Sequence, residues 1–150
     1  MMSYCWTSKD KVKKHAEVFT PAGVVFDMVT QEGIRDCLKD VDKTIFDPAV
    51  GEGQFPCAEL VWKMFYNIEK LDEELALRAL KSLYGMDIQS VSVDKARAHL
   101  LATIQDAYKF FTGKDFDRLN DARSIILDNI QCGDSLKFMN DLTDPQQALF

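Results

Sequence analysis

Three acidic residues stand where a parallel sheet would bring them together. Asp47 follows the apolar residues 44–46, Asp87 closes the apolar segment 83–87, and Asp134 follows a third apolar segment. A carboxylate only accepts hydrogen bonds, so it can hold vicinal hydroxyls or an exocyclic amine, although each Asp taken alone could equally cap a helix. Because ligands of open α/β sheets bind at the carboxyl ends of strands, the pattern predicts a site for a nucleotide-like molecule.

Residues 44–55 combine a short strand with a glycine loop and lead into a helix. Pro48 has no N–H to donate and so ends the strand. Gly51 and Gly53 can take positive φ, and without a Cβ they let a ligand approach the main chain closely. Pro56 suits a first helical position, so the loop should lie at a helix N-terminus, where anionic and polar ligand groups are favoured.

The glycines do not form a dinucleotide-binding fingerprint. That motif needs a third glycine, where this chain has Pro56, and an acidic residue roughly 20 residues further on. The next acidic residue that ends a strand is Asp87, which lies well beyond that distance. A dehydrogenase is therefore disfavoured.

Residues 47–55, Asp-Pro-Ala-Val-Gly-Glu-Gly-Gln-Phe, resemble the S-adenosylmethionine loop of DNA adenine-N6 methyltransferases. Residues 15–21 resemble the Phe-Thr-Pro segment that precedes this loop in restriction-modification members of the family. Residues 83–88 and 129–136 resemble the second and third strands of the same family. The four matches occur in the family's order and span about residues 14–136.

The resemblance implies a Rossmann-like, class I methyltransferase fold that binds S-adenosylmethionine for DNA methylation. It also implies that Asp87 holds the cofactor ribose, that Asp134 contacts the adenine, and that the Phe-Thr-Pro segment covers the methionine end. On the residues alone, Phe19 could equally be a core aromatic. The cofactor-binding residues implied in this way are Phe19, Thr20, Pro21, Asp47, Pro48, Gly51, Gly53, Asp87, Ile88, Asp134 and Ser135.

No residue of the chain is expected to be catalytic. The family aligns a flipped adenine with an Asp or Asn followed by two prolines and an aromatic residue. The prolines here are Pro21, Pro48, Pro56 and Pro145, and no two are adjacent. We therefore expect the cofactor-binding portion of a DNA adenine-N6 methyltransferase, inactive alone, with a missing segment or partner supplying catalysis and DNA recognition.

Two alternatives differ in class. The chain could be a complete, noncatalytic methyltransferase-like protein that binds the cofactor or a partner in restriction or phage defence. It could also be a relic domain without a ligand. Nothing in folding requires Asp47, Asp87 and Asp134 to be acidic together, which disfavours the relic.

The composition indicates one globular domain, which we place at residues 15–150, after a basic arm at residues 1–14. The chain is 47% hydrophobic and 28% charged, with no apolar run of the roughly 18 residues that span a membrane and no signal peptide. We expect a cytoplasmic protein with no membrane contact. Its net charge of −6 predicts that DNA is bound only weakly or through a partner. Lys9, Lys11, Lys13 and Lys14 could touch a DNA backbone, or the arm could simply be solvated.

The hydrophobic pattern predicts alternating helices and strands. We expect a helix from Thr20 to near Gly33 with one more helical turn at residues 34–38, and then a truncated three-stranded parallel sheet flanked by helices. Such a sheet leaves an unpaired edge, which predicts a homodimer or a protein partner. The expected strands are 44–46, 83–87 and 124–130, the helices are 56–70, 72–82 and 89–111, and 112–123 is a loop.

The cysteines do not indicate a metal site or a disulfide framework. Cys5, Cys37, Cys57 and Cys132 are widely spaced, and neither histidine lies near them in sequence. Free thiols are therefore expected.

Overall fold

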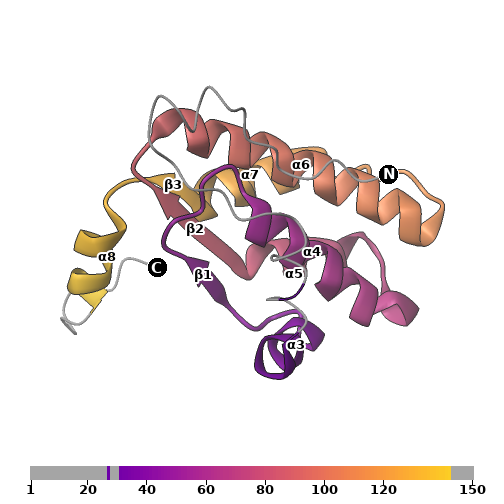
Figure 1. Ribbon diagram of the computed structural model, residues 1–150. Helices are drawn as coiled ribbons and strands as arrows, with labels where there is room; N and C mark the ends of the chain where they lie inside the picture. Colours follow the sequence, from indigo (N-terminus) through magenta and orange to yellow (C-terminus); the bar gives the residue numbers. More distant parts are fainter. Residues whose placement is uncertain (1–26, 28–30, 143–150) are drawn as a thin grey trace.

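The computed structural model describes residue 27 and residues 31–142, which contain a parallel three-stranded sheet with helices packed on it (Figure 1). The strands are β1 (Ile45–Asp47), β2 (Leu83–Asp87) and β3 (Ile130–Cys132). Both strand pairs are parallel. The expected α/β class with three parallel strands flanked by helices is confirmed at this level.

Within residues 31–142, seven helical segments lie between and beyond the strands. In the view of Figure 1, α8 lies at the left, beyond the strands, whereas α4, α5 and α6 lie to their right. The segments are α3 (Glu32–Lys39), α4 (Gln54–Tyr66), the short 3-10 helix η1 (Ile68–Lys70), α5 (Glu73–Lys81), α6 (Ser90–Thr112), α7 (Leu119–Asn129) and α8 (Ser135–Leu142).

β2 is the central strand, and β1 lies at an edge of the described sheet. The strand order is β1-β2-β3, with Ile45 opposite Leu83 and Gly85 opposite Ile130. The strand that enters the glycine loop therefore has a described neighbour on one side only. All three strands run in the same direction, so their carboxyl ends share one edge of the sheet.

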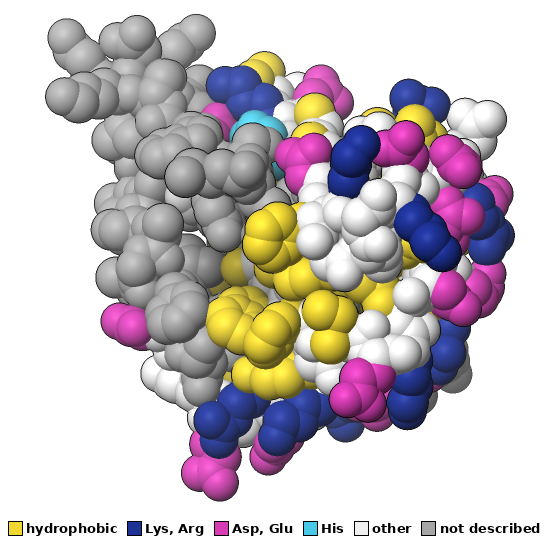
Figure 2. Space-filling view, turned by 90° about the vertical axis from the view of Figure 1, so that its right-hand side faces the viewer, with side chains coloured by type: hydrophobic (Ala, Val, Ile, Leu, Met, Phe, Trp, Pro, Cys, Tyr) yellow, Lys and Arg dark blue, Asp and Glu magenta, His cyan; other side chains and the backbone are white. Residues whose placement is uncertain are grey.

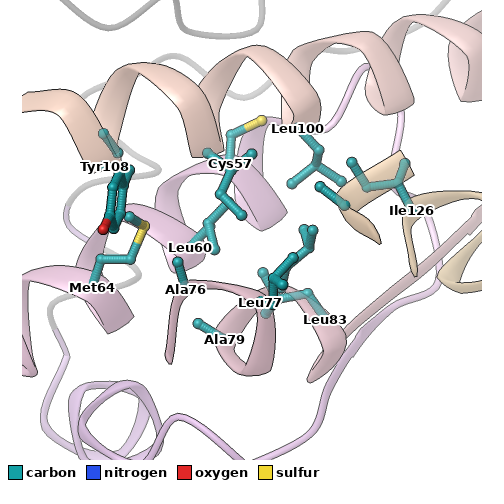
Figure 3. Packing of buried hydrophobic residues seen from close by; sticks show 14 of the residues in the cluster. Cys57, Leu60, Met64, Ala76, Leu77, Ala79, Leu83, Leu100, Tyr108 and Ile126 are labelled. Atoms are coloured by element: carbon teal, nitrogen blue, oxygen red, sulfur yellow. The ribbon is translucent and has the colours of Figure 1, made fainter. Parts of the chain in front are cut away.

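Helices α4, α5, α6 and α7 pack with β2 around one hydrophobic core (Figure 3). Leu60 and Met64 of α4 and Leu100 of α6 are completely buried in it. Fully burying such a side chain contributes about 1.5–3 kcal/mol. This core fixes α4 and α6, the two helices that flank the glycine loop.

Local sequence signals explain several helix ends. Asp72 caps α5, because its carboxylate accepts a hydrogen bond from the Leu75 amide at 2.8 Å. Gly113 ends α6 in a left-handed conformation with φ of +72°. α4 begins at Gln54 rather than at Pro56, and the proline is tolerated because the first N–H groups of a helix have no partner within it.

The predicted third strand at residues 124–130 is wrong over most of its length. These residues belong to α7, and β3 comprises only Ile130–Cys132. Within α7 the buried residues are Ala122, Ile126 and Asn129, whose spacing places them on one side of a helix, whereas Leu127 is 57% exposed. A short apolar run does not distinguish the two periods, and the helical one is realised here. The predicted loop at 112–123 is correspondingly shorter, because α6 includes Thr112 and α7 begins at Leu119.

The expected end of the first helix near Gly33 is also corrected. Gly33 lies inside α3, which continues to Lys39 and includes the additional turn predicted at residues 34–38. No described residue lies within 4 Å of a Cβ built on Gly33, so the described neighbours do not require glycine there. The predicted helix start at Thr20 and the basic arm lie outside the described residues.

Hydrophobic side chains gather on the face of the molecule that Figure 2 shows. On α4, Trp62, Phe65 and Tyr66 contact one another, and Phe65 lies 6.2 Å from Phe111 at the end of α6, between ring centroids. Phe110 is 72% exposed. Among the described residues, no helix is both long and apolar enough to cross a membrane.

Candidate functional site

The glycine loop folds back onto the central strand. The Val50 amide donates to the carbonyl of Met86 at 3.0 Å, and the Gly53 amide donates to the carbonyl of Val50 at 2.9 Å. Gly51 and Gly53 have φ of +55° and +90°, which other L-residues rarely adopt. Gly53 is also the N-cap of α4. Both predicted glycines thus perform the conformational role expected of them.

Close packing between the loop and β2 requires a further glycine. A Cβ built on Gly85 would lie 2.7 Å from Cγ2 of Val50. That distance is shorter than real side-chain contacts, so a larger residue at this position would displace the loop. Gly85 therefore sets how closely the loop approaches the strand.

Asp87 joins the loop to the end of β2. Its Oδ2 accepts a hydrogen bond from the Gly51 amide at 3.1 Å, and its Oδ1 accepts one from the Gln89 amide at 2.8 Å. Each carboxylate oxygen has two acceptor positions, so the side chain retains capacity to bind hydroxyls of a ligand. Asp87 is half-buried, which leaves part of it accessible.

Asp47 carries an acceptor without a described partner. Its Oδ1 accepts from the Ala49 amide at 3.0 Å, but its Oδ2 is buried and, among the described residues, makes no hydrogen bond. Burial raises the pKa of Asp47 above its usual value, and the nearby carboxylate of Asp87 adds to the increase. A buried acceptor without a partner costs about 1–3 kcal/mol, so it calls for a functional explanation.

Glu59 on α4 carries a second buried carboxyl, and the charge of Asp47 affects its ionisation. Burial and, to a smaller extent, the charge of Asp47 raise the pKa of Glu59 to about 8, and Lys63 opposes the increase. At pH 7 Glu59 therefore keeps its proton. The buried acid that senses the charge of Asp47 is therefore neutral.

Lys63 follows Glu59 by one helical turn. Its hydrogen bonds link the segment before β1 to α4 and to the end of α5. Its ammonium donates to the carbonyls of Asp40, Val41 and Lys43 and to Oγ of Ser82, at 2.6–3.2 Å. Burial lowers the pKa of Lys63 to about 8, and Glu59 opposes that decrease. These acceptors replace water around the charge, so Lys63 is a structural cation.

The end of β3 adjoins the end of β2. The Gly133 amide donates to the carbonyl of Asp87 at 3.0 Å. The exposed Asp134 then caps α8, because its Oδ1 accepts from the amides of Leu136 and Lys137 at 3.0 and 3.3 Å. Ile88, which follows Asp87, is 73% exposed. This corner combines acceptors with an apolar side chain.

The structure brings some of the predicted site residues together and says nothing of others. Hydrogen bonds connect Gly51 with Asp87, and the main chains of Asp87 and Gly133. Pro48 is exposed at the end of β1, and Ser135 is half-buried at the start of α8. The predicted residues Phe19, Thr20 and Pro21 lie outside the described residues.

Five charged or polar residues on or near the loop and its flanking helices were not predicted from the sequence. Glu59 and Lys63 are four residues apart on α4, and Lys95 and His99 are four apart on α6. The oppositely charged Glu59 and Lys63 at this spacing within the mostly apolar α4 were an available signal. The fifth, Glu52, was overlooked because it stands between the two loop glycines.

Residues 27 and 31–142 contain no group of three or more His, Cys, Asp or Glu side chains placed to hold a metal ion. Among the described residues, Cys37, Cys57 and Cys132 form no disulfide, and Cys5 lies outside the described part of the chain.

The chain matches no protein-family model, no curated protein and no solved structure. Its function therefore has to be inferred from the residues of the site and their geometry.

Proposed function

We propose that the chain is the S-adenosylmethionine-binding portion of a DNA adenine-N6 methyltransferase, with a further segment or a partner chain completing the enzyme. The observation that carries this proposal is the joining of the glycine loop to Asp87 at the carboxyl edge of the sheet, through the 3.1 Å hydrogen bond from Gly51. This is where open α/β sheets bind nucleotides, and the loop is the segment that resembles the family.

The ribose fits Asp87. Its two oxygens each accept one amide hydrogen bond, so each keeps a second acceptor position for one of two vicinal hydroxyls. The Gly51 and Gln89 amides orient the carboxylate in advance. An oriented acceptor loses less freedom on binding, which favours affinity.

The ammonium group of the cofactor's methionine part fits Asp47. A cation beside the buried Oδ2 would supply its missing partner and would lower the pKa that burial has raised. When bound, S-adenosylmethionine supplies an electrophilic methyl group on its sulfonium. The neutral Glu59 below avoids a second negative charge at the same place.

The adenine fits the corner between the ends of β2 and β3. Ile88 offers an exposed apolar side chain against which a base can pack. Asp134 uses Oδ1 for the α8 amides, so its second oxygen can accept from an exocyclic amine. The arrangement supports an adenosyl ligand at the same edge as Asp87.

A partner would have to supply the groups that align the target adenine. β1 is an edge strand of the described sheet, so a parallel strand from a further segment, a second copy or another protein could pair with it. The net charge of −6 supports DNA recognition through that partner rather than through this chain.

The test is calorimetric titration with S-adenosylmethionine and with its demethylated product. We expect saturable binding that is lost in Asp87→Ala and weakened at least about tenfold in Asp47→Asn. Asp47→Asn keeps the acceptor for Ala49 and removes a buried charge, so its thermal stability should equal or exceed that of the wild type. Asp128→Ala, an exposed carboxylate on α7, is the matched control and should bind normally.

Two outcomes would contradict the proposal. One is the absence of binding at millimolar ligand by protein whose circular dichroism shows that it is folded. The other is methylation of duplex DNA by this chain alone, which would remove the need for a partner. Binding that persists without any partner able to restore methyl transfer would instead favour the noncatalytic binding protein.

A further inference from the structure

Helix α6 holds the glycine loop at three points. Nζ of Lys95 lies 3.2 Å from Oε1 of Glu52, and Nδ1 of His99 lies 2.8 Å from the carbonyl oxygen of the same Glu52. A Cβ built on Gly53 would lie 3.2 Å from Cα of Ala96. One face of one helix thus contacts the side chain and the main chain of two successive loop residues.

Glu52 places a carboxyl side chain between the two glycines of the loop. Its side chain is 0% exposed, whereas that of Lys95 is 46% exposed. The Glu52 carboxylate is enclosed and has the ammonium group of Lys95 within 3.2 Å, so this contact favours one position of the Glu52 side chain. Because Glu52 stands between Gly51 and Gly53, fixing it restricts the positive-φ conformations on both sides.

His99 fixes the main chain of Glu52 independently of the ion pair. A carbonyl oxygen can only accept, so Nδ1 of His99 carries the proton in this contact. The carbonyl of His99 in turn accepts from Oγ1 of Thr103 at 2.7 Å. The completely buried Leu100 and Ile104 anchor this part of α6 in the core.

We propose that Glu52 is a positioning residue for the cofactor site, with Lys95 and His99 as its anchors. This inference rests on the proposed function. Glu52 points into the protein and holds Gly51 where its amide donates to Asp87, so that the Asp87 carboxylate faces the ligand in the required orientation. Loosening Glu52 should weaken binding even though no ligand contact is removed.

The experiment compares Lys95→Met, the conservative Lys95→Arg and the control Lys109→Met. Lys109 also lies on α6 and forms an ion pair, with Asp115 at 2.7 Å, but it is exposed and distant in sequence from the loop contacts. The first readout is the dissociation constant of the demethylated cofactor product, measured where each variant is fully folded. The second is amide hydrogen exchange and the ¹H–¹⁵N shifts of Gly51 and Gly53 without ligand.

We expect Lys95→Met to raise the dissociation constant about tenfold or more, to shift the two glycine signals and to accelerate their exchange. Lys95→Arg should leave both readouts close to their wild-type values, and Lys109→Met should change neither. Should Lys95→Met be too unstable to measure, Glu52→Gln, which keeps the shape of the side chain, is expected to change both readouts in the same direction.

Two results would overturn the proposal separately from the proposed function. If Lys95→Met loses stability but binds as tightly as the wild type, Glu52 and Lys95 only stabilise the fold. If the glycine signals are unchanged in the variant, the ion pair does not position the loop. Absence of binding by the wild type refutes the proposed function itself, and the ligand role of Glu52 with it.

Discussion

Glu52 and Glu59 are both buried carboxyls of one loop-helix unit, yet their surroundings differ. Glu52 forms an ion pair with Lys95, whose side chain reaches the surface. Glu59 precedes Lys63 by four residues on α4, but burial and the charge of Asp47 raise its pKa to about 8. The region around Glu52 uses an ion pair to fix a loop. The region around Glu59 instead keeps a buried acid neutral near Asp47.

The difference teaches that the position of a lysine decides what it does. Lys95 is half in solvent and directs its charge to one carboxylate. Lys63 is enclosed and donates hydrogen bonds to three carbonyls and a hydroxyl of the connecting segments. We expect changes around Glu52 to affect binding first, and changes around Glu59 and Lys63 to affect stability first.

Replacing Lys63 should have the largest effect on stability. Lys63→Met fills the space but leaves the buried carbonyl of Val41 and the part-buried carbonyl of Lys43 without this donor. Because each buried acceptor left without a donor costs about 1–3 kcal/mol, we expect the free energy of unfolding to fall by about 3 kcal/mol or more, measured by urea denaturation. Lys81→Met, at the exposed end of α5, should change it by less than about 0.5 kcal/mol. A similar small loss in both variants would show that Lys63 is not the structural cation of this region.

The pH dependence of stability tests the region around Glu59. The pKa of Glu59 is about 8 in the folded protein and 4.5 ordinarily, so between these values the folded state keeps a proton that the unfolded state releases. The contribution of Glu59 to stability is therefore complete below about pH 4.5 and is lost as the pH rises towards 8. The loss can reach about 1.4 kcal/mol per pH unit.

Glu59→Gln removes this titration, so the stability difference between variant and wild type should shift in favour of the variant by up to about 4 kcal/mol between pH 5 and pH 8. Denaturant unfolding across this range measures it. Glu69→Gln, on the exposed 3-10 helix, should run parallel to the wild type. A constant difference for Glu59→Gln would mean that this carboxyl ionises normally in the fold.

Gly85→Ala would disturb the loop region from the strand side. The new methyl carbon would lie 2.7 Å from Cγ2 of Val50, so the loop must move away from β2. We expect a loss of about 1–3 kcal/mol in stability together with weaker cofactor binding. Unchanged affinity in the folded variant would show that the loop tolerates displacement, and that its position does not control binding.

The sequence predicted the elements whose patterns are long or sharply ended. The strand Leu83–Asp87 and the helix Ser90–Thr112 agree with their predicted ranges within one residue at each end, because apolar periodicity and Asp87 define them. The helix α7 was missed because the adjacent isoleucines 125 and 126 fit either period. Which period is realised depends on contacts of Ala122 and Ile126 with the core.

The candidate site was predictable only as far as its local motif. Gly51, Gly53 and Asp87 could be chosen from the loop and the strand end, and the structure connects the loop to Asp87. The unpaired Oδ2 of Asp47 and the neutral Glu59 depend on burial by segments distant in the chain. No spacing rule contains that information, since burial arises only when the helices pack.

Two further glycines provide a baseline for these effects, because within the described part of the chain nothing lies within 4 Å of a Cβ built on either of them. Gly33 is inside α3 without positive φ, so Gly33→Ala should stabilise the protein by about 0.5–1 kcal/mol. Gly113 has φ of +72°, so Gly113→Ala should destabilise it by about 1 kcal/mol. Neither variant should change cofactor affinity. If Gly85→Ala costs no more than Gly113→Ala and also leaves binding intact, the close contact with Val50 does not control the loop.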